Sequence, residues 1–156
     1  MIHVTGSAGA RAGGPDRARD RGMTGGTILI EGDAGDHPGF RMRRGTLAIA
    51  GRAGASPCYR MIAGTVVVGR GGGDYPGLEM RRGSVILLDP DTEPTVGPGF
   101  ASAGVFADHA VPALRLILRH LHALGCDVPR SAAWRLSVGD SMQLNKAELW
   151  HRVSPV

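Results

Sequence analysis

Short runs of aliphatic and β-branched residues recur along the chain at a fixed spacing. The runs are TILI at residues 27–30, TLAI at 46–49, TVVV at 65–68 and SVIL at 84–87. Each run begins 19 residues after the one before it, as in 46 − 27 = 19. Runs of this length and composition, bounded by glycine, predict β-strands rather than helices.

These strands belong to longer units that follow one another without gaps. The units are MTGGTILIEGDAGDHPGFR from Met23, MRRGTLAIAGRAGASPCYR from Met42, MIAGTVVVGRGGGDYPGLE from Met61 and MRRGSVILLDPDTEP from Met80. One position is glycine in every unit, namely Gly26, Gly45, Gly64 and Gly83, and another is proline in three units. Because glycine and proline suit tight corners, we interpret the four glycines as structural.

Stacking the units on one another aligns their side chains in columns. Two aliphatic columns are expected to face inward: Ile28, Leu47, Val66 and Val85, and then Ile30, Ile49, Val68 and Leu87. The methionines that begin the units should also face inward, and Phe40, Tyr59 and Leu78 can share their strand face. The column Leu29, Ala48, Val67 and Ile86 is expected to point outward, as an exposed apolar ladder for docking or beneath a C-terminal helix.

A 19-residue unit with short strands and no helix predicts one coil of a parallel β-helix. A β-propeller blade needs about 40–45 residues, and the spacing typical of leucine-rich repeats is absent from the chain. We therefore predict an all-β fold. Its main part would be a right-handed parallel β-helix with 19-residue coils and GXGXG-like punctuation over residues 23–89, followed by a C-terminal α-helix and small strands.

Residues 1–22 are expected to contain a partial coil and an insertion. The sequence GSAG at Gly6 echoes GDAG at Gly32 with an offset of 26, which is 19 + 7. The segment GPDRARDR would then be inserted at one corner. The chain would begin within a coil, so further coils before Met1 or a partner would be needed to cover the exposed strand edge.

Residues 90–108 are expected to form a turn-rich connector, and residues 109–156 a helix with short strands. The segment DHAVPALRLILRHLHALG predicts a helix over about residues 109–124, with Asp108 as its N-cap and Gly125 just past its end. We expect this helix to cap the last coil. The final segment, AWRLSVGDSMQLNKAELWHRV, predicts one or two strands.

The charge of the chain comes mainly from arginine. The formal net charge is +4, and Lys146 is the only lysine among 18 basic residues. Arg43 and Arg81 occupy one position of the unit, and Arg44 and Arg82 occupy the next. Since guanidinium groups bind carboxylates at two points, these four arginines are a candidate strip for acidic groups of a partner. The alternative is a solvated corner on which like charges keep to alternate coils.

Enzymatic and metal-binding classes find little support in the sequence. His120 and His122 would lie about 200° apart on a helix and cannot share a metal. Neither Cys58 nor Cys126 has an obvious histidine partner in the sequence, and GRGGGDYPG lacks the Lys-Ser/Thr of a phosphate-binding loop. We predict no catalytic residue, no metal and no cofactor bound by this chain.

Nucleic-acid and membrane binding are also not predicted. Aromatic residues make up only 4% of the chain, too few for a stacking surface, and the single lysine adds little to a phosphate-binding face. No apolar run approaches the length of a membrane span or forms a signal peptide, so we predict a cytoplasmic protein.

The segment GGTILIEGDAGDHPGFRMRRGTLAIAGRAG resembles the C-type subunit of formylmethanofuran dehydrogenase. It is more closely similar to the C-type subunit of the bacterial formyltransferase/hydrolase complex of methylotrophs. The same glycine-punctuated β-helix is similar to the C-terminal domain of glutamate synthase large subunits. The resemblance covers residues 2–88 and continues more loosely towards the C-terminus, and family members carry further coils ahead of the start of this chain.

The resemblance implies a non-catalytic assembly subunit of a complex in one-carbon metabolism. In that complex a formyl group passes from a tetrahydromethanopterin carrier to a methanofuran-type carrier and is hydrolysed to formate, and other subunits carry out both reactions. Carboxylates of sister subunits, or the polyglutamyl tail of the carrier, would bind Arg43, Arg44, Arg81 and Arg82. The alternative is a spacer domain between the active centres of a glutamate synthase-like protein.

Overall fold

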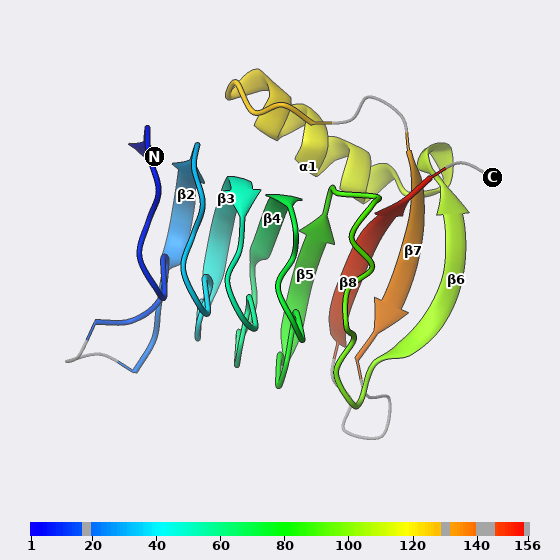
Figure 1. Ribbon diagram of the computed structural model, residues 1–156, viewed down its shortest axis with the longest axis horizontal. Helices are drawn as coiled ribbons and strands as arrows, with labels where there is room; N and C mark the ends of the chain where they lie inside the picture. Colours follow the sequence, from blue (N-terminus) through cyan, green and yellow to red (C-terminus); the bar gives the residue numbers. More distant parts are fainter. Residues whose placement is uncertain (17–19, 129–131, 140–145, 155–156) are drawn as a thin grey trace.

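The chain folds into one mixed β-sheet with a single α-helix among the residues that the structure describes (Figure 1). This computed structural model describes residues 1–16, 20–128, 132–139 and 146–154. The strands are β1 (Ile2–Val4), β2 (Thr24–Ile30), β3 (Arg44–Arg52), β4 (Thr65–Arg70), β5 (Arg82–Leu87), β6 (Ala101–Ala107), β7 (Ala133–Val138) and β8 (Lys146–Val153). The helices are the 3-10 helix η1 (Asp108–Ala110) and the α-helix α1 (Pro112–Ala123). A mostly β chain with one C-terminal α-helix is thereby confirmed.

Strands β1 to β5 lie parallel to one another in sequence order. Leu47 lies opposite Val66, and Val66 lies opposite Val85, so both registers have the 19-residue offset of the sequence units. Ile2 of β1 lies opposite Ile28 of β2, an offset of 26 that matches the echo between GSAG and GDAG. We call the chain from one of these strands to the next a coil. Residues 17–19 of the predicted insertion lie outside the described residues.

Each coil returns to the next strand through a second line of parallel contacts and a tight corner. Ala34 pairs with Ala8 and with Ala53 through isolated parallel bridges. In the corners, three residues per coil have positive φ: His37, Gly39 and Arg41, then Ser56, Cys58 and Arg60, then Tyr75, Gly77 and Glu79. Backbone hydrogen bonds join one corner to the next and so hold these conformations in place, as from Cys58 N to Pro38 O at 2.7 Å.

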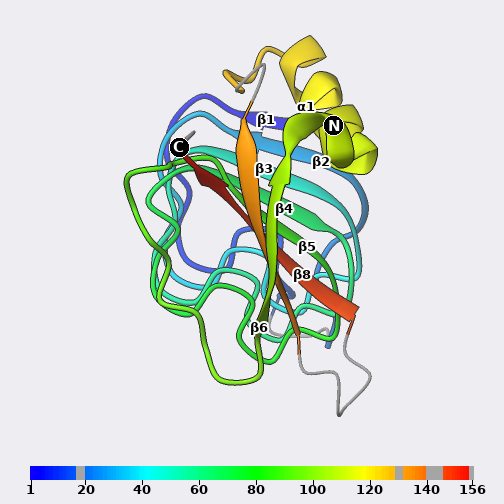
Figure 2. The same ribbon diagram turned by 90° about the vertical axis from the view of Figure 1, so that its right-hand side faces the viewer.

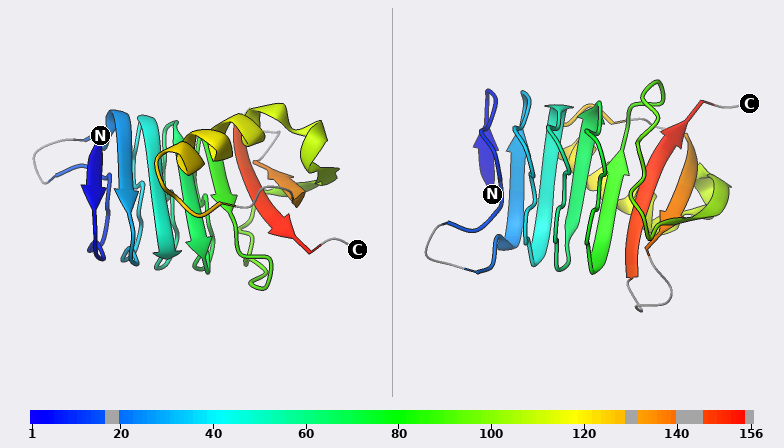
Figure 3. Two further views of the ribbon diagram at one scale, coloured as in Figure 1. Left: turned by 90° about the horizontal axis from the view of Figure 1, so that it is seen from above. Right: turned by 60° about the horizontal axis from the view of Figure 1, so that its bottom comes forward.

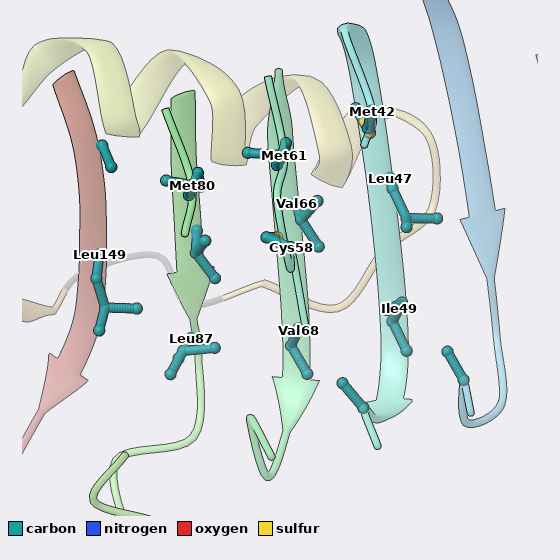
Figure 4. Packing of buried hydrophobic residues seen from close by; sticks show 14 of the residues in the cluster. Met42, Leu47, Ile49, Cys58, Met61, Val66, Val68, Met80, Leu87 and Leu149 are labelled. Carbon is teal, nitrogen blue, oxygen red and sulfur yellow. The ribbon is translucent and has the colours of Figure 1, made fainter. Parts of the chain in front are cut away.

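The interior of the stacked coils is a continuous apolar core (Figure 4). The two predicted inward columns are confirmed. Leu47, Val66 and Val85 of the first column are fully buried in this core, and all four residues of the second column are buried in the same cluster: Ile30, Ile49, Val68 and Leu87. Met42 and Met61 lie in the same core and are also fully buried. Side chains that repeat at the same position of each coil therefore pack against their own counterparts above and below.

The prediction that Phe40 and Tyr59 share a strand face with the methionines is wrong. Both residues lie in corner turns, where the alternation of a strand does not hold, and both are half-buried. Their rings stack on each other with centroids 5.7 Å apart. Cys58, rather than Tyr59, is fully buried at this corner.

Helix α1 covers the outward face of the parallel strands. The predicted outward column is buried in one cluster with the helix; the members are Leu29, Ala48, Val67 and Ile86 from the strands and Leu114, Leu118 and Leu121 from α1. Figures 1 and 3 show α1 running along the row of strands. The expected exposed ladder is therefore wrong, and the alternative of a ladder under the helix is correct. The expectation that the helix caps the last coil is also wrong, because its apolar stripe fits the face of the sheet.

Strands β8, β7 and β6 lie across the end of the stack (Figure 2). β8 pairs in parallel with β5, which places Leu149 opposite Val85 and extends the inner core by one strand. β7 and β6 then continue the sheet in antiparallel fashion. The strands predicted in the final segment are confirmed as β7 and β8. Residues 90–108, which were predicted to form a connector, contain β6. The prediction missed this strand because β6 forms by pairing with β7, and no local sequence pattern indicates that pairing.

Helix α1 begins later than predicted, and Asp108 is not its N-cap. The cap position is Val111, and Pro112 occupies the first turn, where proline needs no backbone donor. Asp108 instead accepts a hydrogen bond from Trp134 Nε1 at 3.3 Å and pairs with Arg115. Gly125 has a φ of +89° after the end of the helix, as predicted.

Candidate binding surface

The four arginines of the predicted strip are all exposed. Arg43 and Arg81 each donate a backbone N–H to a methionine carbonyl of the preceding coil, which fixes their places one above the other. They are two coils apart, or about 10 Å at the usual spacing of strands. Arg44 begins β3 and Arg82 begins β5, so this pair is likewise two coils apart. None of the four side chains forms a hydrogen bond or an ion pair with another part of the described chain.

The structure adds a fifth cation to this strip. Pairing of β5 with β8 places Lys146 directly opposite Arg82, and both side chains are exposed. The single lysine of the chain thus extends the basic strip by one strand. We name Arg43, Arg44, Arg81, Arg82 and Lys146 the basic strip.

A groove of about 320 Å³ opens beside the basic strip and is lined by Arg41, Arg60, Ile62, Glu79 and Arg81. The residues come from two positions of the coil. Arg41, Arg60 and Glu79 are the last positive-φ residues of three successive corners. Ile62 and Arg81 follow two residues later in their coils, at the position that Arg43 holds in the first. Stacking of the coils therefore gathers three guanidinium groups around one aliphatic side chain.

Two of the three guanidinium groups in the groove already have carboxylate partners. Arg60 Nε lies 2.6 Å from Glu79 Oε2, and this hydrogen bond together with the charge of Glu79 raises the pKa of Arg60. Arg41 Nη1 lies 3.1 Å from Asp20 Oδ1, although Asp20 is 87% exposed. Arg81 has no carboxylate partner among the described residues. The groove therefore offers one unpaired guanidinium to an incoming anion.

Only Arg81 of the four sequence-predicted arginines lines the groove. Arg43, Arg44 and Arg82 lie outside it, and the sequence reasoning missed Arg41 and Arg60. The signal that would have found them is the 19-residue spacing of Arg41, Arg60 and Glu79 itself. That column holds charges in three successive coils, whereas the MRRG phrase drew attention to alternate coils.

The two cysteines lie in surroundings that disfavour the reactive thiolate. Cys58 is fully buried in the core, and burial raises the pKa of its thiol far above the ordinary value. Burial also raises the pKa of Cys126, which is partly covered beside α1. Because the thiolate is the nucleophile, both groups are poor candidates for covalent catalysis.

The histidines and acidic residues are dispersed over the described part of the chain. Within it, no three side chains of His, Cys, Asp or Glu lie close enough to hold a metal ion. His120 and His122 are exposed on α1. His151 is buried and places Nε2 3.1 Å from the carbonyl oxygen of Asp89. Of the helices that the structure describes, none is long and apolar enough to cross a membrane.

Comparison with solved structures finds a chain of the formyltransferase/hydrolase complex (FhcABCD) from Methylorubrum extorquens, whose crystal structure was determined in complex with methylofuran. The two chains are 38% identical, with a TM-score of 0.81. The match covers 98% of this chain and 56% of that chain, so this chain spans a little over half the length of its structural neighbour. No protein-family model and no curated protein sequence matches the chain.

Proposed function

We propose that the chain is a non-catalytic assembly subunit of a formyltransferase/hydrolase complex in one-carbon metabolism. The observation that carries the proposal is the 38% identity to a chain of such a complex over 98% of this chain. A shared fold alone would not indicate a shared function, but this level of identity along nearly the whole chain supports one. In this proposal the chain corresponds to the C-type subunit of the formylmethanofuran dehydrogenase family and works in the cytoplasm.

The proposed role of the fold is that of a rigid mount. We take the stacked coils to be a right-handed parallel β-helix whose 19-residue registers and continuous core support this interpretation. A close-packed core resists bending, so surfaces on successive coils keep fixed distances from one another. Such a body holds sister subunits in fixed positions without taking part in their reactions.

The basic strip is the surface that we assign to acidic partners. Its arginines, Arg43, Arg44, Arg81 and Arg82, are exposed and have no carboxylate partner in the described chain. Carboxylates of sister subunits, or the polyglutamyl tail of a methanofuran-type carrier, have the charge that this strip would bind. The complex would use that carrier and tetrahydromethanopterin as substrates of its other subunits, and this chain would bind no cofactor itself.

Affinity purification of the tagged chain from its native host tests this proposal. Mass spectrometry should identify formyltransferase and amidohydrolase-like subunits in stoichiometric amounts. A variant carrying Arg43→Gln, Arg44→Gln, Arg81→Gln and Arg82→Gln should fold normally but retain less of these subunits at physiological salt. Recovery of glutamate synthase components instead would favour the spacer alternative, and recovery of the chain without partners would contradict both.

A further inference from the structure

The groove beside the basic strip contains a carboxylate of the chain itself. Glu79 lines the groove, and its carboxylate oxygen Oε2 reaches Arg60 Nε at 2.6 Å. Both side chains are about half exposed, at 52% and 54%. The positive φ of both residues, +54° for Glu79 and +53° for Arg60, places them at equivalent corners of adjacent coils. The contact shows that a carboxylate on an aliphatic stem fits this surface.

The remaining part of the groove also has guanidinium groups beside an aliphatic side chain, but its lining contains no second carboxylate. Arg81 has no carboxylate partner in the described chain, and Arg41 is paired only with the highly exposed Asp20. Ile62 lines the groove from the coil between those of Arg41 and Arg81 and is half-buried, so it offers an apolar surface to a methylene chain. A guanidinium next to an aliphatic side chain suits a carboxylate on a short stem better than it suits a bare, strongly hydrated anion.

We propose that the groove formed by Arg41, Arg60, Ile62 and Arg81 binds a carboxylate on a short aliphatic stem, and that Glu79 competes with it for Arg60. The inference deepens the proposed function and rests on it for the source of the carboxylate, which would be an acidic side chain of a sister subunit. The chemistry of the site is separate from that source, because a free dicarboxylate presents the same groups.

Binding is measured by NMR titration of the 156-residue chain at low ionic strength, with glutarate as the probe. Glu79→Gln frees Arg60 and should tighten glutarate binding about two- to fivefold, the range typical of one exposed ion pair. Arg81→Gln should weaken binding at least as much. Arg119→Gln is the matched control, because it removes the same charge from the exposed face of α1, outside both the groove and the basic strip, and it should change the affinity less than twofold.

Two further ligands separate the carboxylate from other anions and from its source. Inorganic phosphate should bind more weakly than glutarate and should not distinguish Arg81→Gln from Arg119→Gln. A capped peptide with one central glutamate should follow the same order of variants as glutarate. Thermal unfolding of each variant should match the parent, which shows that the changes are local.

Each failure has a separate meaning. Equal losses in Arg81→Gln and Arg119→Gln, or no gain in Glu79→Gln, would overturn the groove, because general surface charge would then explain binding. Phosphate that binds as tightly as glutarate would overturn the assignment to a carboxylate. If the variants behave as expected but the tagged chain recovers no sister subunits, the groove stands and the proposed function falls. If the subunits are recovered but glutarate does not bind, the proposed function stands and the proposed carboxylate site in the groove falls.

Discussion

Alanine substitutions at the repeated glycine position test the stacking of the coils. They separate the cost of a positive φ from the cost of a clash with the backbone of the adjacent coil. Gly83 has a φ of +101°, and a Cβ built on it would lie 2.3 Å from the carbonyl oxygen of Gly64. Gly26 holds the same position at the start of the stack with a φ of +81°, but a Cβ there would meet nothing within 4 Å. Its neighbour Gly25 has open space and no positive φ. The three glycines therefore differ in one factor at a time.

The expected cost of alanine rises along this series. Gly25→Ala should change the free energy of unfolding by less than about 1 kcal/mol, because neither factor applies. Gly26→Ala should cost about 1–3 kcal/mol for the positive φ alone. Gly83→Ala adds a backbone clash, for which overpacking data give about 1–3 kcal/mol more, so we expect a total loss of about 2–6 kcal/mol.

Urea unfolding followed by far-UV circular dichroism measures all three differences. The slope of the transition should stay constant across the series, so that the shift in midpoint reports stability alone. Equal losses for Gly26→Ala and Gly83→Ala would refute the reasoning, because the close approach of adjacent coils would then contribute nothing. A loss of several kcal/mol in Gly25→Ala would refute it as well.

Three further predictions concern the helix, a corner and the cysteines. Leu121→Ala, at a fully buried site of α1, should lower the free energy of unfolding by about 2–5 kcal/mol in the same urea assay, whereas Leu116→Ala on the exposed face should change it by less than about 1 kcal/mol. Burial of Asp89 raises its pKa. Hydrogen bonds from the Gly71 backbone, the Thr92 hydroxyl and the Asp91 backbone, together with the charge of His151, outweigh this effect and hold the pKa below its usual value. Its carboxylate therefore stabilises the fold above about pH 4, and the stability gap between the parent and Asp89→Asn should shrink as the pH falls towards about 3; a gap that widens would contradict this sign. In native protein at about pH 8 a thiol reagent should label Cys126 before Cys58, and both should react in urea; rapid native labelling of Cys58 would contradict its burial.

The inner core could be predicted because its information is repeated. Leu47, Val66 and Val85 stand at one position of successive units, so stacking alone aligns them. The outward direction of Val67 and Ile86 followed from the same alternation. The alternation could not predict that α1 covers these two side chains, because α1 follows all of the coils in the sequence and its docking is not encoded in the repeat.

The elements that the sequence did not predict are those fixed by distant partners or by corners. Strand β6 has the sequence ASAGVFA, with few β-branched residues, and becomes a strand through pairing with β7. Tyr59 and Arg60 lie in a corner where positive φ at alternate residues reverses the directions that a strand would give them. For the same reason, the alternation of side chains along a strand could not predict the groove around Ile62. The charged column that lines it, Arg41, Arg60 and Glu79, nevertheless has the same 19-residue spacing as the core residues.

The most direct test of the assembly role is the mass of the complex that is purified from the native host with the tagged chain. Native mass spectrometry should find the 16.3 kDa chain in a stable assembly with formyltransferase and hydrolase subunits, and formyltransferase activity should elute with it. A tagged chain found alone, at 16.3 kDa plus the mass of its tag, with the activity in other fractions, would contradict the proposed function.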